Sequence, residues 1–494
     1  MASTSFLNSL IRVCQDPWIR ALLCGFLAWR LVLAAVLPFT VDGAYGLTMG
    51  REVSLSYFDH PPLSFWLAAA SEALLGRWNE IGIRLPIIFL GSLTLLGFAG
   101  FIYPIFGLYS ARIGVALFGM SWAGSITGIE ALPDSILFFG LSWFFMILVH
   151  GALAVFGHGQ PLGIWTWAIA GAALAVAFAS KYQAVVVIFP VLIWIIVTPK
   201  SHSWLYSPGF WLAFVLALVG GLPALLWNMN HDWSSLSFQS GRIGQDVSFG
   251  SFVVLLLAQG LYLGPALLIL MIRSAFSSEI WQNPVYRLML VTGLFGVIFF
   301  NLIFIFSPGS LPHWPVPSWL ALLAFAASAF SHVRRVWITV LVWVSVVAQQ
   351  LIVLLIGLHM HGGVLALNCE IADWDQTSPQ IKIETLRNGL DRSGLLPDAP
   401  RIYAPNWLQA GYISIALGPN SLVSVLSTDQ RHFQFARSQI LEEGVLVSLD
   451  PGDDFLPEQW IAEGFELISK ERFLLDRGTC PYFSLTISAI SQTQ

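Results

Sequence analysis

Charged residues are scarce in this sequence. Asp, Glu, Lys and Arg make up 10% of the 494 residues, whereas 56% are hydrophobic and the mean hydropathy is +0.73. A soluble domain usually carries about 25% charged residues. The deficit therefore argues for a protein embedded in a lipid bilayer. The 23 Lys and Arg residues are scattered and do not line one face, which argues against nucleic-acid binding.

Cysteine is also scarce, with four residues in the whole chain. Cys14 and Cys24 lie at or within the first hydrophobic segment, whereas Cys369 and Cys480 lie in the polar C-terminal part. The absence of a Cys-x-x-Cys pair argues against a zinc ribbon. Cys369 and Cys480 could form a disulfide bond if that part is exported, but the sequence does not give the distance between them.

The sequence also lacks an internal repeat and a low-complexity tract, and we expect no cleavable signal peptide. Its first apolar run has no small-residue cleavage site and is followed by further apolar runs. We therefore expect the N-terminal segment to remain as the first membrane span.

Long apolar runs, in contrast, are abundant. A helix that crosses a membrane needs about 20 apolar residues, and the runs predict a mainly α polytopic protein with about 11 spans. The shorter run Pro62–Leu75 is interrupted by polar residues, and we expect an amphipathic helix that lies in the membrane interface. The predicted spans are Trp18–Pro38, Ile81–Phe106, Ile113–Thr127, Ser135–Phe156, Leu162–Ala179, Tyr182–Val197, Phe210–Trp227, Phe252–Ile272, Leu288–Phe306, Val316–Phe330 and Val336–Leu358.

The basic residues favour one orientation, because cytoplasmic connections are enriched in Lys and Arg. With the N-terminus inside, the outer loops contain fewer basic residues, of which Arg51, Arg77 and Arg242 are the clear ones. This orientation places the C-terminus outside the cytoplasm. The cytoplasmic segments then contain Arg12, Arg20, Arg112, Lys200, Arg273, Arg287, Arg334 and Arg335.

The composition changes at about Gly362, where charges become frequent and long apolar runs stop. We therefore expect a transmembrane module over residues 1–361 and a small extracytoplasmic α/β domain over residues 362–494, which is a normal domain size. A helical pattern covers Gln380–Leu390. Short β-like runs lie at Tyr412–Leu417, Leu422–Leu426, Val445–Leu449 and Phe483–Ile487.

Polar residues collect in the loops that this topology places on the outer side. Ionisable residues close to membrane spans mark candidate functional sites. The first outer loop contains Asp42 and Tyr45 and ends with Tyr57-Phe58-Asp59-His60-Pro61-Pro62. The later outer loops contain Asp134, Lys181, His231, Arg242 and His313.

These side chains suit a phosphate-linked substrate. Lys181 and Arg242 could neutralise a phosphate or pyrophosphate, and a carboxylate could take the proton from an attacking hydroxyl group. Asp59, His231 and a third ligand could hold a divalent metal ion.

The same residues also have purely structural interpretations. Asp42 could cap a helix, and Asp59-His60-Pro61-Pro62 could be an ordinary helix start. Lys181 could extend to the membrane interface, and His313 could form hydrogen bonds in the aromatic belt. The residues alone leave both interpretations open.

Six short motifs, in the same order, resemble those of the bacterial members of the protein-O-mannosyltransferase-like superfamily. That superfamily includes the lipid A aminoarabinose and galacturonic acid transferases. Asp42-Gly43-Ala44-Tyr45 resembles the family's Asp-Glu-Ala-Tyr motif, and the matching region extends from about Val41 to Pro317. The other five motifs are Tyr57-Phe58-Asp59-His60-Pro61-Pro62, Arg84-Leu85-Pro86, Leu132-Pro133-Asp134, Ala179-Ser180-Lys181-Tyr182 and Pro312-His313-Trp314-Pro315.

The resemblance implies the GT-C fold and the transfer of a hexosyl or pentosyl group from a polyprenyl-phosphate sugar, with inversion at the anomeric carbon. The acceptor would be a lipid, a glycan or a protein at the extracytoplasmic face of the bacterial inner membrane. Residues and resemblance together give these candidates: Asp42 (catalytic base) and Asp134 (assisting) for catalysis, Lys181, Arg242 and His60 for the donor phosphate, Tyr45, Tyr57 and His313 for substrate, and Asp59 and His231 for a divalent metal ion.

The sequence departs from the family pattern at three places. Gly43 stands where relatives usually have Glu after the key Asp, and Gly46 replaces a common Tyr. Pro133-Asp134 lacks the preceding Thr. One carboxylate of the pattern is therefore missing, which leaves metal dependence open.

Two other functions are compatible with a polytopic chain: a secondary transporter of a small or lipid-linked solute, and a non-catalytic glycolipid-binding protein. Transporters usually carry inverted repeats and polar sites near the bilayer midplane. Here the polar residues gather at one face and no repeat is visible. The sequence identifies neither the sugar nor the acceptor.

Overall fold

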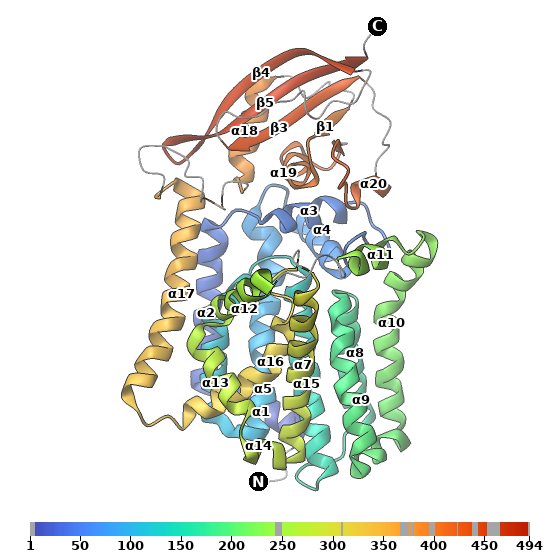
Figure 1. Cartoon of the computed structure of the whole chain (residues 1–494), viewed down its shortest axis with the longest axis vertical. Helices are drawn as coiled ribbons and strands as arrows, with labels where there is room; N and C mark the ends of the chain where they lie inside the picture. Colours follow the sequence, from blue (N-terminus) through green and yellow to red (C-terminus); the bar gives the residue numbers. More distant parts are fainter. Residues whose placement is uncertain are drawn as a thin grey trace.

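The chain folds into a helical bundle with a β-sheet at one end (Figure 1). This computed structural model describes residues 5–242, 249–307, 310–365, 375, 377, 380–394, 401–421, 423–436, 443–451 and 465–492. The N-terminal helix α1 (Phe6–Gln15) lies at the end of the bundle that is farthest from the sheet. The predicted mainly helical membrane protein with a small C-terminal sheet region is confirmed.

Apolar helices make up the bundle. Their ends follow ordinary rules: Asp16, for example, caps α2 by accepting a hydrogen bond from the backbone N–H of Ile19, and Pro17 starts the helix. The remaining helices up to the sheet are α2 (Pro17–Val36), α3 (Val41–Gly50), α4 (Leu63–Leu75), α5 (Glu80–Gly119), α6 (Trp122–Ile126), α7 (Pro133–Val155), α8 (Ile164–Phe178), η1 (Tyr182–Val187), α9 (Ile188–Val197), η2 (Pro199–Tyr206), α10 (Pro208–Asn230), α11 (Ser234–Gly241), α12 (Phe249–Leu263), α13 (Pro265–Ala275), α14 (Ser278–Gln282), α15 (Pro284–Ile305), α16 (Val316–Ser331) and α17 (Val336–Gly362).

Six of the described helices are long and apolar enough to cross a membrane, namely α2, α5, α7, α10, α15 and α17. Two bent pairs pass the same test when each is taken as one span: Tyr182–Val197 with η2, bent by 111°, and α12 with α13, bent by 104°. The protein is therefore a multi-pass membrane protein. The total of about 11 spans stays a prediction, because several other apolar helices, such as α8 and α16, are shorter.

Element α5 consists of two helices that meet at residue 107 and form a hairpin. The sequence likewise predicts two separate spans, one on either side of that residue. Gly107 has φ 81° and ψ 172°, a conformation outside the helical region that glycine adopts without a steric penalty. The two halves pack closely together. The evidence is that a Cβ atom on Gly114, in the second half, would lie 2.3 Å from the side chain of Ile102, in the first half. The second half continues through α6 to Glu130, which forms an ion pair with Arg84 near the start of α5.

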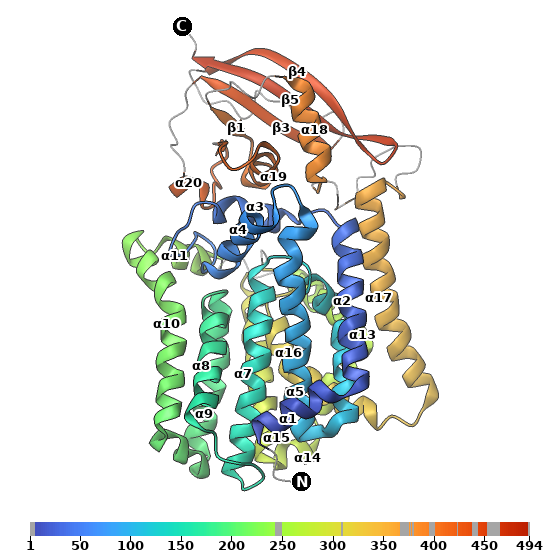
Figure 2. The same cartoon turned by 180° about the vertical axis from the view of Figure 1, so that it is seen from behind.

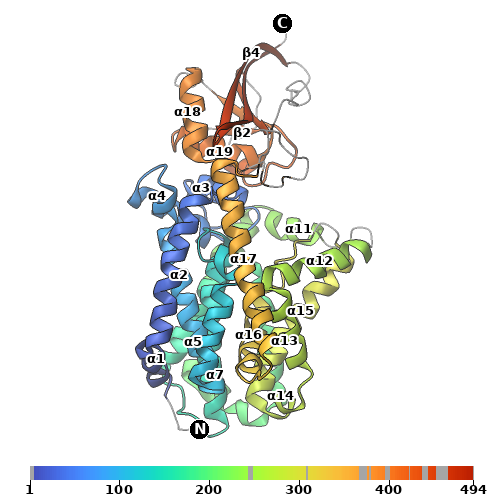
Figure 3. The ribbon, with the colours of Figure 1, turned by 90° about the vertical axis from the view of Figure 1, so that its left-hand side faces the viewer.

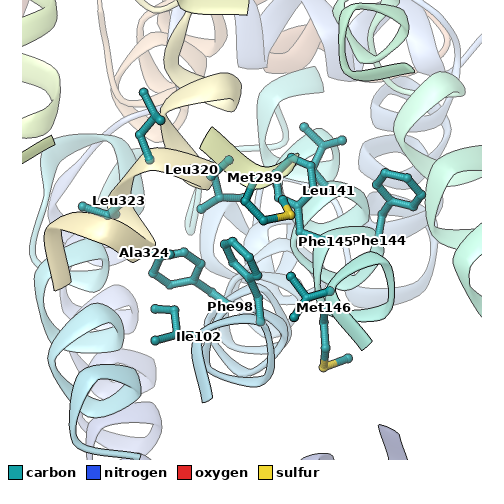
Figure 4. Packing of buried hydrophobic residues seen from close by; sticks show 14 of the residues in the cluster. Phe98, Ile102, Leu141, Phe144, Phe145, Met146, Met289, Leu320, Leu323 and Ala324 are labelled. Carbon is teal, nitrogen blue, oxygen red and sulfur yellow. The ribbon is translucent and has the colours of Figure 1, made fainter. Parts of the chain in front are cut away.

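The core of the bundle is a close-packed set of aromatic and aliphatic side chains (Figure 4). Phe98 and Ile102 of α5 lie beside Leu141 and Phe145 of α7, with Met289 of α15 in the same cluster. Because lipid tails are as apolar as these side chains, close packing contributes more to helix association here than removal from water does.

The C-terminal part is built on a five-stranded mixed sheet in the order β2-β1-β3-β5-β4. β1 pairs in parallel with β2 and β3, whereas β5 pairs antiparallel with β3 and β4. The elements are α18 (Ile383–Ser393), β1 (Ile402–Ala404), α19 (Trp407–Leu417), β2 (Val423–Val425), α20 (Phe433–Ala436), β3 (Gly444–Pro451), β4 (Phe465–Arg477) and β5 (Cys480–Gln492).

One predicted strand, Tyr412–Leu417, is wrong: this segment belongs to helix α19. Asn406 caps the helix by accepting a hydrogen bond from the backbone N–H of Gln409. The segment is buried on every side, so its apolar run has no polar face from which a helical period could be read. The division of the chain at residues 361 and 362 stays a prediction. The pairing of Cys369 with Cys480 also stays a prediction, because Cys369 lies outside the described residues.

A layer of short helices, α3, α4 and α11, lies crosswise between the bundle and the sheet (Figures 1 and 2). Two hydrogen bonds fasten α19 to it: Tyr412 Oη donates to the carbonyl oxygen of Phe39 at 2.7 Å, and Thr48 Oγ1 donates to that of Gly411 at 3.0 Å. Gly411 permits the close approach, because a Cβ atom there would lie 2.9 Å from the backbone nitrogen of Tyr45. The sheet region is therefore held directly above the outer loops, with α17 rising to meet it (Figure 3).

Candidate functional site

A cavity of about 630 Å³ lies where the bundle, the layer of short helices and the C-terminal part meet. Three carboxylates and three cationic side chains line it, which is a high density of charge for a membrane protein. Its ionisable and amide-bearing lining residues are Asp42, Tyr45, Asp59, His60, Asp134, Lys181, Tyr182, Gln183, Gln239, Arg242, Tyr262, His313 and Arg431.

Asp42 projects into this cavity from the first turn of α3. The residue that caps α3 is Thr40, whose Oγ1 accepts a hydrogen bond from the backbone N–H of Gly43 at 3.0 Å. The Asp42 side chain forms no hydrogen bond with the described residues and faces the cavity. Enclosure by protein raises the pKa of this carboxyl, and the charges of Arg431 and Lys181 oppose the rise. Asp42 is therefore not a helix cap, and its carboxylate is open to a ligand in the cavity.

Asp134 and Lys181 form an ion pair on the wall of the cavity. Pro133 starts α7 and places Asp134 in its first turn, and Lys181 Nζ lies 2.7 Å from both carboxylate oxygens of Asp134. The Lys181 side chain is 5% exposed, so it does not extend to the membrane interface. The pair places one cation at a fixed point in the cavity.

Two histidines, His60 and His313, complete this side of the cavity. Burial, followed by the charge of Lys181, lowers the pKa of His60 to about 3 and that of His313 to about 4. Both imidazoles are therefore neutral near pH 7 and can exchange hydrogen bonds without adding charge. His60 Nδ1 is buried and has no hydrogen-bond partner in the described part of the chain.

Arg242 enters the cavity at the end of α11. Its guanidinium group lies 5.0 Å from the ring centre of Trp314 and 5.5 Å from that of Phe238. No carboxylate of the described residues lies within ion-pair distance of it. The group is therefore positioned by aromatic rings and remains available to an anionic ligand.

Asp59 is buried at the side of the cavity that faces the C-terminal part. Its Oδ1 accepts a hydrogen bond from Tyr45 Oη at 3.1 Å, and its Oδ2 lies 3.9 Å from Arg431 Nη1. Burial raises the pKa of Asp59 to about 6, against the opposing charge of Arg431. Tyr45 Oη in turn accepts a hydrogen bond from the backbone N–H of His432 at 3.1 Å.

Two predicted site residues, Tyr57 and His231, do not line the cavity. Tyr57 is buried, donates a hydrogen bond to the carbonyl oxygen of Glu52 and stacks on Phe65. The ring of His231 stacks on Trp227 at 4.1 Å. Tyr57 therefore stabilises the loop that carries Asp59 instead of contacting a ligand in the cavity.

The residues present do not fit the predicted metal site. Both oxygens of Asp59 already face hydrogen-bond or charge partners, and His231 does not line the cavity that Asp59 lines. Among the residues that the structure describes, no three His, Cys, Asp or Glu side chains form a group that could hold a metal ion. We therefore assign no step of a reaction to a metal.

Sequence reasoning missed the contribution of the C-terminal part, which lines the cavity with Trp407, Leu408 and Arg431. These residues carried no usable signal, because charges are common in that part of the sequence. Their position depends on the docking of α19 onto α3, which no local pattern shows.

The missing acid at Gly43 also has a structural counterpart. A Cβ atom on Gly43 would lie 2.7 Å from Glu130 Oε2, so the carboxylate of Glu130 occupies the space of a side chain at residue 43. Glu130 pairs with the buried Arg84, which also donates to the carbonyl oxygens of Leu37 and Pro38 at 2.7 Å. This network fixes the chain directly before Asp42.

Comparison with known proteins supports the same relationship. Residues 59–227 match the family model described as dolichyl-phosphate-mannose-protein mannosyltransferase. The chain is 26% identical over 244 residues to the lipid A galacturonosyltransferase RgtD of Rhizobium johnstonii, and the match spans 48% of this chain and 48% of that relative.

Two solved structures share the fold over nearly the whole chain. ArnT from Cupriavidus metallidurans bound to undecaprenyl phosphate has a TM-score of 0.62 and 13% identity, covering 96% of this chain and 98% of ArnT. The same protein in the apo state has a TM-score of 0.61 and 13% identity, with 95% and 97% covered. The resemblance inferred from the sequence is thereby confirmed: the chain shares the GT-C fold of ArnT, and part of it is similar to the mannosyltransferase family model and to a lipid A galacturonosyltransferase.

Proposed function

We propose that this protein is an inverting glycosyltransferase that moves a sugar from a polyprenyl-phosphate carrier to an acceptor hydroxyl group. The observation that carries the proposal is the cavity itself, where Asp42 faces Lys181, Arg242 and neutral histidines at the edge of the bundle. A base opposite fixed cations is the arrangement that a displacement at a phosphate-linked carbon requires.

The donor lipid fits the apolar side of the cavity. Phe299, Phe300 and Ile303 of α15 form part of that wall, and Val185 and Leu311 line the cavity while being 47% and 41% exposed. Exposed apolar residues at the rim suit an opening toward lipid, through which a polyprenyl chain can lie. The binding of undecaprenyl phosphate by ArnT, which shares the fold, supports this class of carrier.

In the proposed reaction, the acceptor oxygen attacks the anomeric carbon of the donor sugar as the bond from that carbon to the phosphate oxygen breaks. Asp42 takes the proton of the acceptor hydroxyl group. The polyprenyl phosphate leaves with an additional negative charge, which Lys181 and Arg242 stabilise, while His60 and His313 offer hydrogen bonds. Asp134 holds Lys181 in place through its two 2.7 Å contacts. Attack from the face opposite to the phosphate inverts the anomeric configuration.

We further propose a lipid acceptor and an extracytoplasmic site. The lipid A galacturonosyltransferase among the relatives supports a glycolipid, in preference to a protein or a glycan. The distribution of basic residues supports an orientation in which the cavity and the C-terminal part lie on the outer face of the inner membrane.

Replacing the base tests this proposal. Asp42→Asn keeps the size of the side chain but removes its proton affinity, so we expect transfer to fall by a factor of about 100 or more. Radiolabelled sugar transfer in membranes that contain the purified chain would measure this loss. Asp232→Asn, an exposed carboxylate outside the cavity, is the matched control and should keep normal activity.

Undecaprenyl phosphate should still raise the thermal unfolding temperature of the Asp42→Asn protein, because the donor phosphate is bound by other residues. Near-normal transfer by Asp42→Asn would refute the assignment. Uptake of a solute driven by an ion gradient, without any transfer, would instead favour a transporter.

A further inference from the structure

The C-terminal part contributes a charged residue to the cavity, and this contribution deepens the proposed function on which it rests. Arg431 lies in the short segment between β2 and α20 and lines the cavity together with Trp407. Its side chain is 18% exposed, although it belongs to the part of the protein that lies outside the bundle.

Four side chains surround the guanidinium group of Arg431. Its central carbon lies 4.7 Å from the ring centres of both Phe238 and Trp407, which come from different parts of the chain. Its Nε lies 3.0 Å from a carboxylate oxygen of Asp429, and its Nη1 lies 3.9 Å from Asp59 Oδ2. Phe238 belongs to α11 and Asp59 to the first outer loop, so Arg431 connects three separate elements of the site.

The backbone around Arg431 is fastened to the same loop. Arg431 has φ 51°, a left-handed conformation that is uncommon for a residue with a side chain and that neighbouring contacts must stabilise. The next residue supplies these contacts: the backbone N–H of His432 donates to Tyr45 Oη, and the backbone N–H of Phe58 donates to His432 Nδ1, each at 3.1 Å. The segment is therefore attached to Phe58, the neighbour of Asp59 in the chain, and to Tyr45, which donates a hydrogen bond to Asp59.

We propose that Arg431 is a built-in cation for Asp59, in the place where a divalent metal would otherwise neutralise this carboxylate. As a positioning residue, it keeps Asp59 oriented toward Tyr45 and closes the cavity from the C-terminal side. A divalent cation beside Asp59 would face the fixed positive charge of Arg431, which disfavours its binding. The planar guanidinium suits this position because it packs against two rings while pairing with a carboxylate, whereas Lys cannot stack in this way.

Three variants of the full-length protein test the proposal. Arg431→Ala should lower the turnover number for sugar transfer on the order of 10- to 100-fold, because it leaves a buried carboxylate without its partner. Arg431→Lys should recover part of the loss, since the charge returns without the stacking. Arg392→Ala, on the exposed face of α18 in the same part of the protein, is the control and should behave as wild type.

A double variant separates a specific pairing from a general structural role. If Arg431 acts through Asp59, the Asp59→Ala/Arg431→Ala protein should be no less active than Asp59→Ala alone. Independent, multiplicative losses would contradict the pairing. Stabilisation by added undecaprenyl phosphate, measured as a shift in unfolding temperature, verifies that each variant remains folded.

Metal analysis provides the second readout. The purified wild-type protein should hold less than one equivalent of zinc, manganese or magnesium, and chelation with EDTA should leave transfer unchanged. One equivalent of metal that is lost in Asp59→Ala would overturn the proposal, as would full activity of Arg431→Ala. If Arg431→Ala is fully active while Asp42→Asn is inactive, the inference fails and the glycosyltransferase assignment stands. Full activity of Asp42→Asn would refute the assignment itself.

Discussion

At the scale of single residues, Gly43 and Glu130 show how one side chain occupies the place of another. The space beside Cα of Gly43 is filled by the carboxylate of Glu130, which comes from a loop almost 90 residues later in the sequence. Glu130 Oε2 is buried without a hydrogen-bond partner in the described part, whereas the rest of the carboxylate pairs with Arg84. Glycine at position 43 is therefore required by contact and not by backbone conformation.

This contact predicts a reciprocal exchange. Gly43→Glu alone should destabilise the protein, because its Cβ atom would clash with a carboxylate and a second buried negative charge would be added. Glu130→Ala alone should cost about 3–5 kcal/mol, because Arg84 would lose its buried partner. The double variant Gly43→Glu/Glu130→Ala places one carboxylate near Arg84 again and should recover part of that stability.

Thermal unfolding of the purified variants in detergent would measure these differences. A wild-type unfolding temperature for Gly43→Glu alone would show that the space is not filled as described. A double variant that is less stable than both single variants would show that the two carboxylates cannot replace each other.

The residue scale also shows which parts of the site could be derived from sequence. Asp42, Asp59, Asp134, Lys181 and Arg242 line one cavity because all of them follow or precede apolar runs at the same membrane face. The sequence could not show that the side chain of Tyr57 turns into its own loop, because aromatic stacking on Phe65 decides that orientation. Nor could it show the stacking of His231 on Trp227.

At the scale of helices, α8 and α10 approach each other through small residues. A Cβ atom on Gly220 of α10 would lie 2.2 Å from the carbonyl oxygen of Ala175 of α8, whereas a Cβ atom on Gly221 would meet nothing within 4 Å. Small residues at such positions let helix backbones come close within a membrane. Substitutions at Gly220 and Gly221 therefore allow a matched comparison, in which only the first should disturb the contact between the two helices.

We predict that Gly220→Ala destabilises the bundle by about 1–3 kcal/mol, since the added methyl group forces α8 and α10 apart. Gly221→Ala should be neutral or stabilising by about 0.5–1 kcal/mol, because alanine favours a helix over glycine. Unfolding of both proteins in the same detergent checks the difference. Equal unfolding temperatures would contradict the close approach of the two helices.

Element boundaries followed from the sequence where apolar runs were long and ended at Pro or polar residues, as in α7, α10 and α15. In the C-terminal part the sequence pattern predicts a strand where the structure has helix α19, and it predicts neither β1 nor β4. In that part the burial of α19 between the sheet and α3 overrides its local pattern. The helical pattern of α18 was found, because one face of that helix is polar.

At the scale of the whole molecule, the membrane bundle and the sheet region together form one site. The bundle and the outer loops with their short helices supply the carboxylates and cations that the sequence predicted, and the C-terminal part supplies Trp407 and Arg431. The predicted spans are enough to identify these carboxylates and cations, because membrane topology restricts which loops can meet. The spans do not identify Trp407 and Arg431, because the position of these two residues depends on how the folded C-terminal part docks on the outer loops.

We propose that this cavity transfers a sugar onto a lipid at the outer face of the inner membrane. Mass spectrometry of envelope glycolipids, from a strain that lacks this protein and from the same strain with it restored, tests that claim most directly. We predict that one glycolipid loses the mass of a single sugar residue in the deletion strain. We also expect that the wild-type gene restores this mass and that the Asp42→Asn gene does not. Identical glycolipid spectra in all of these strains would contradict it.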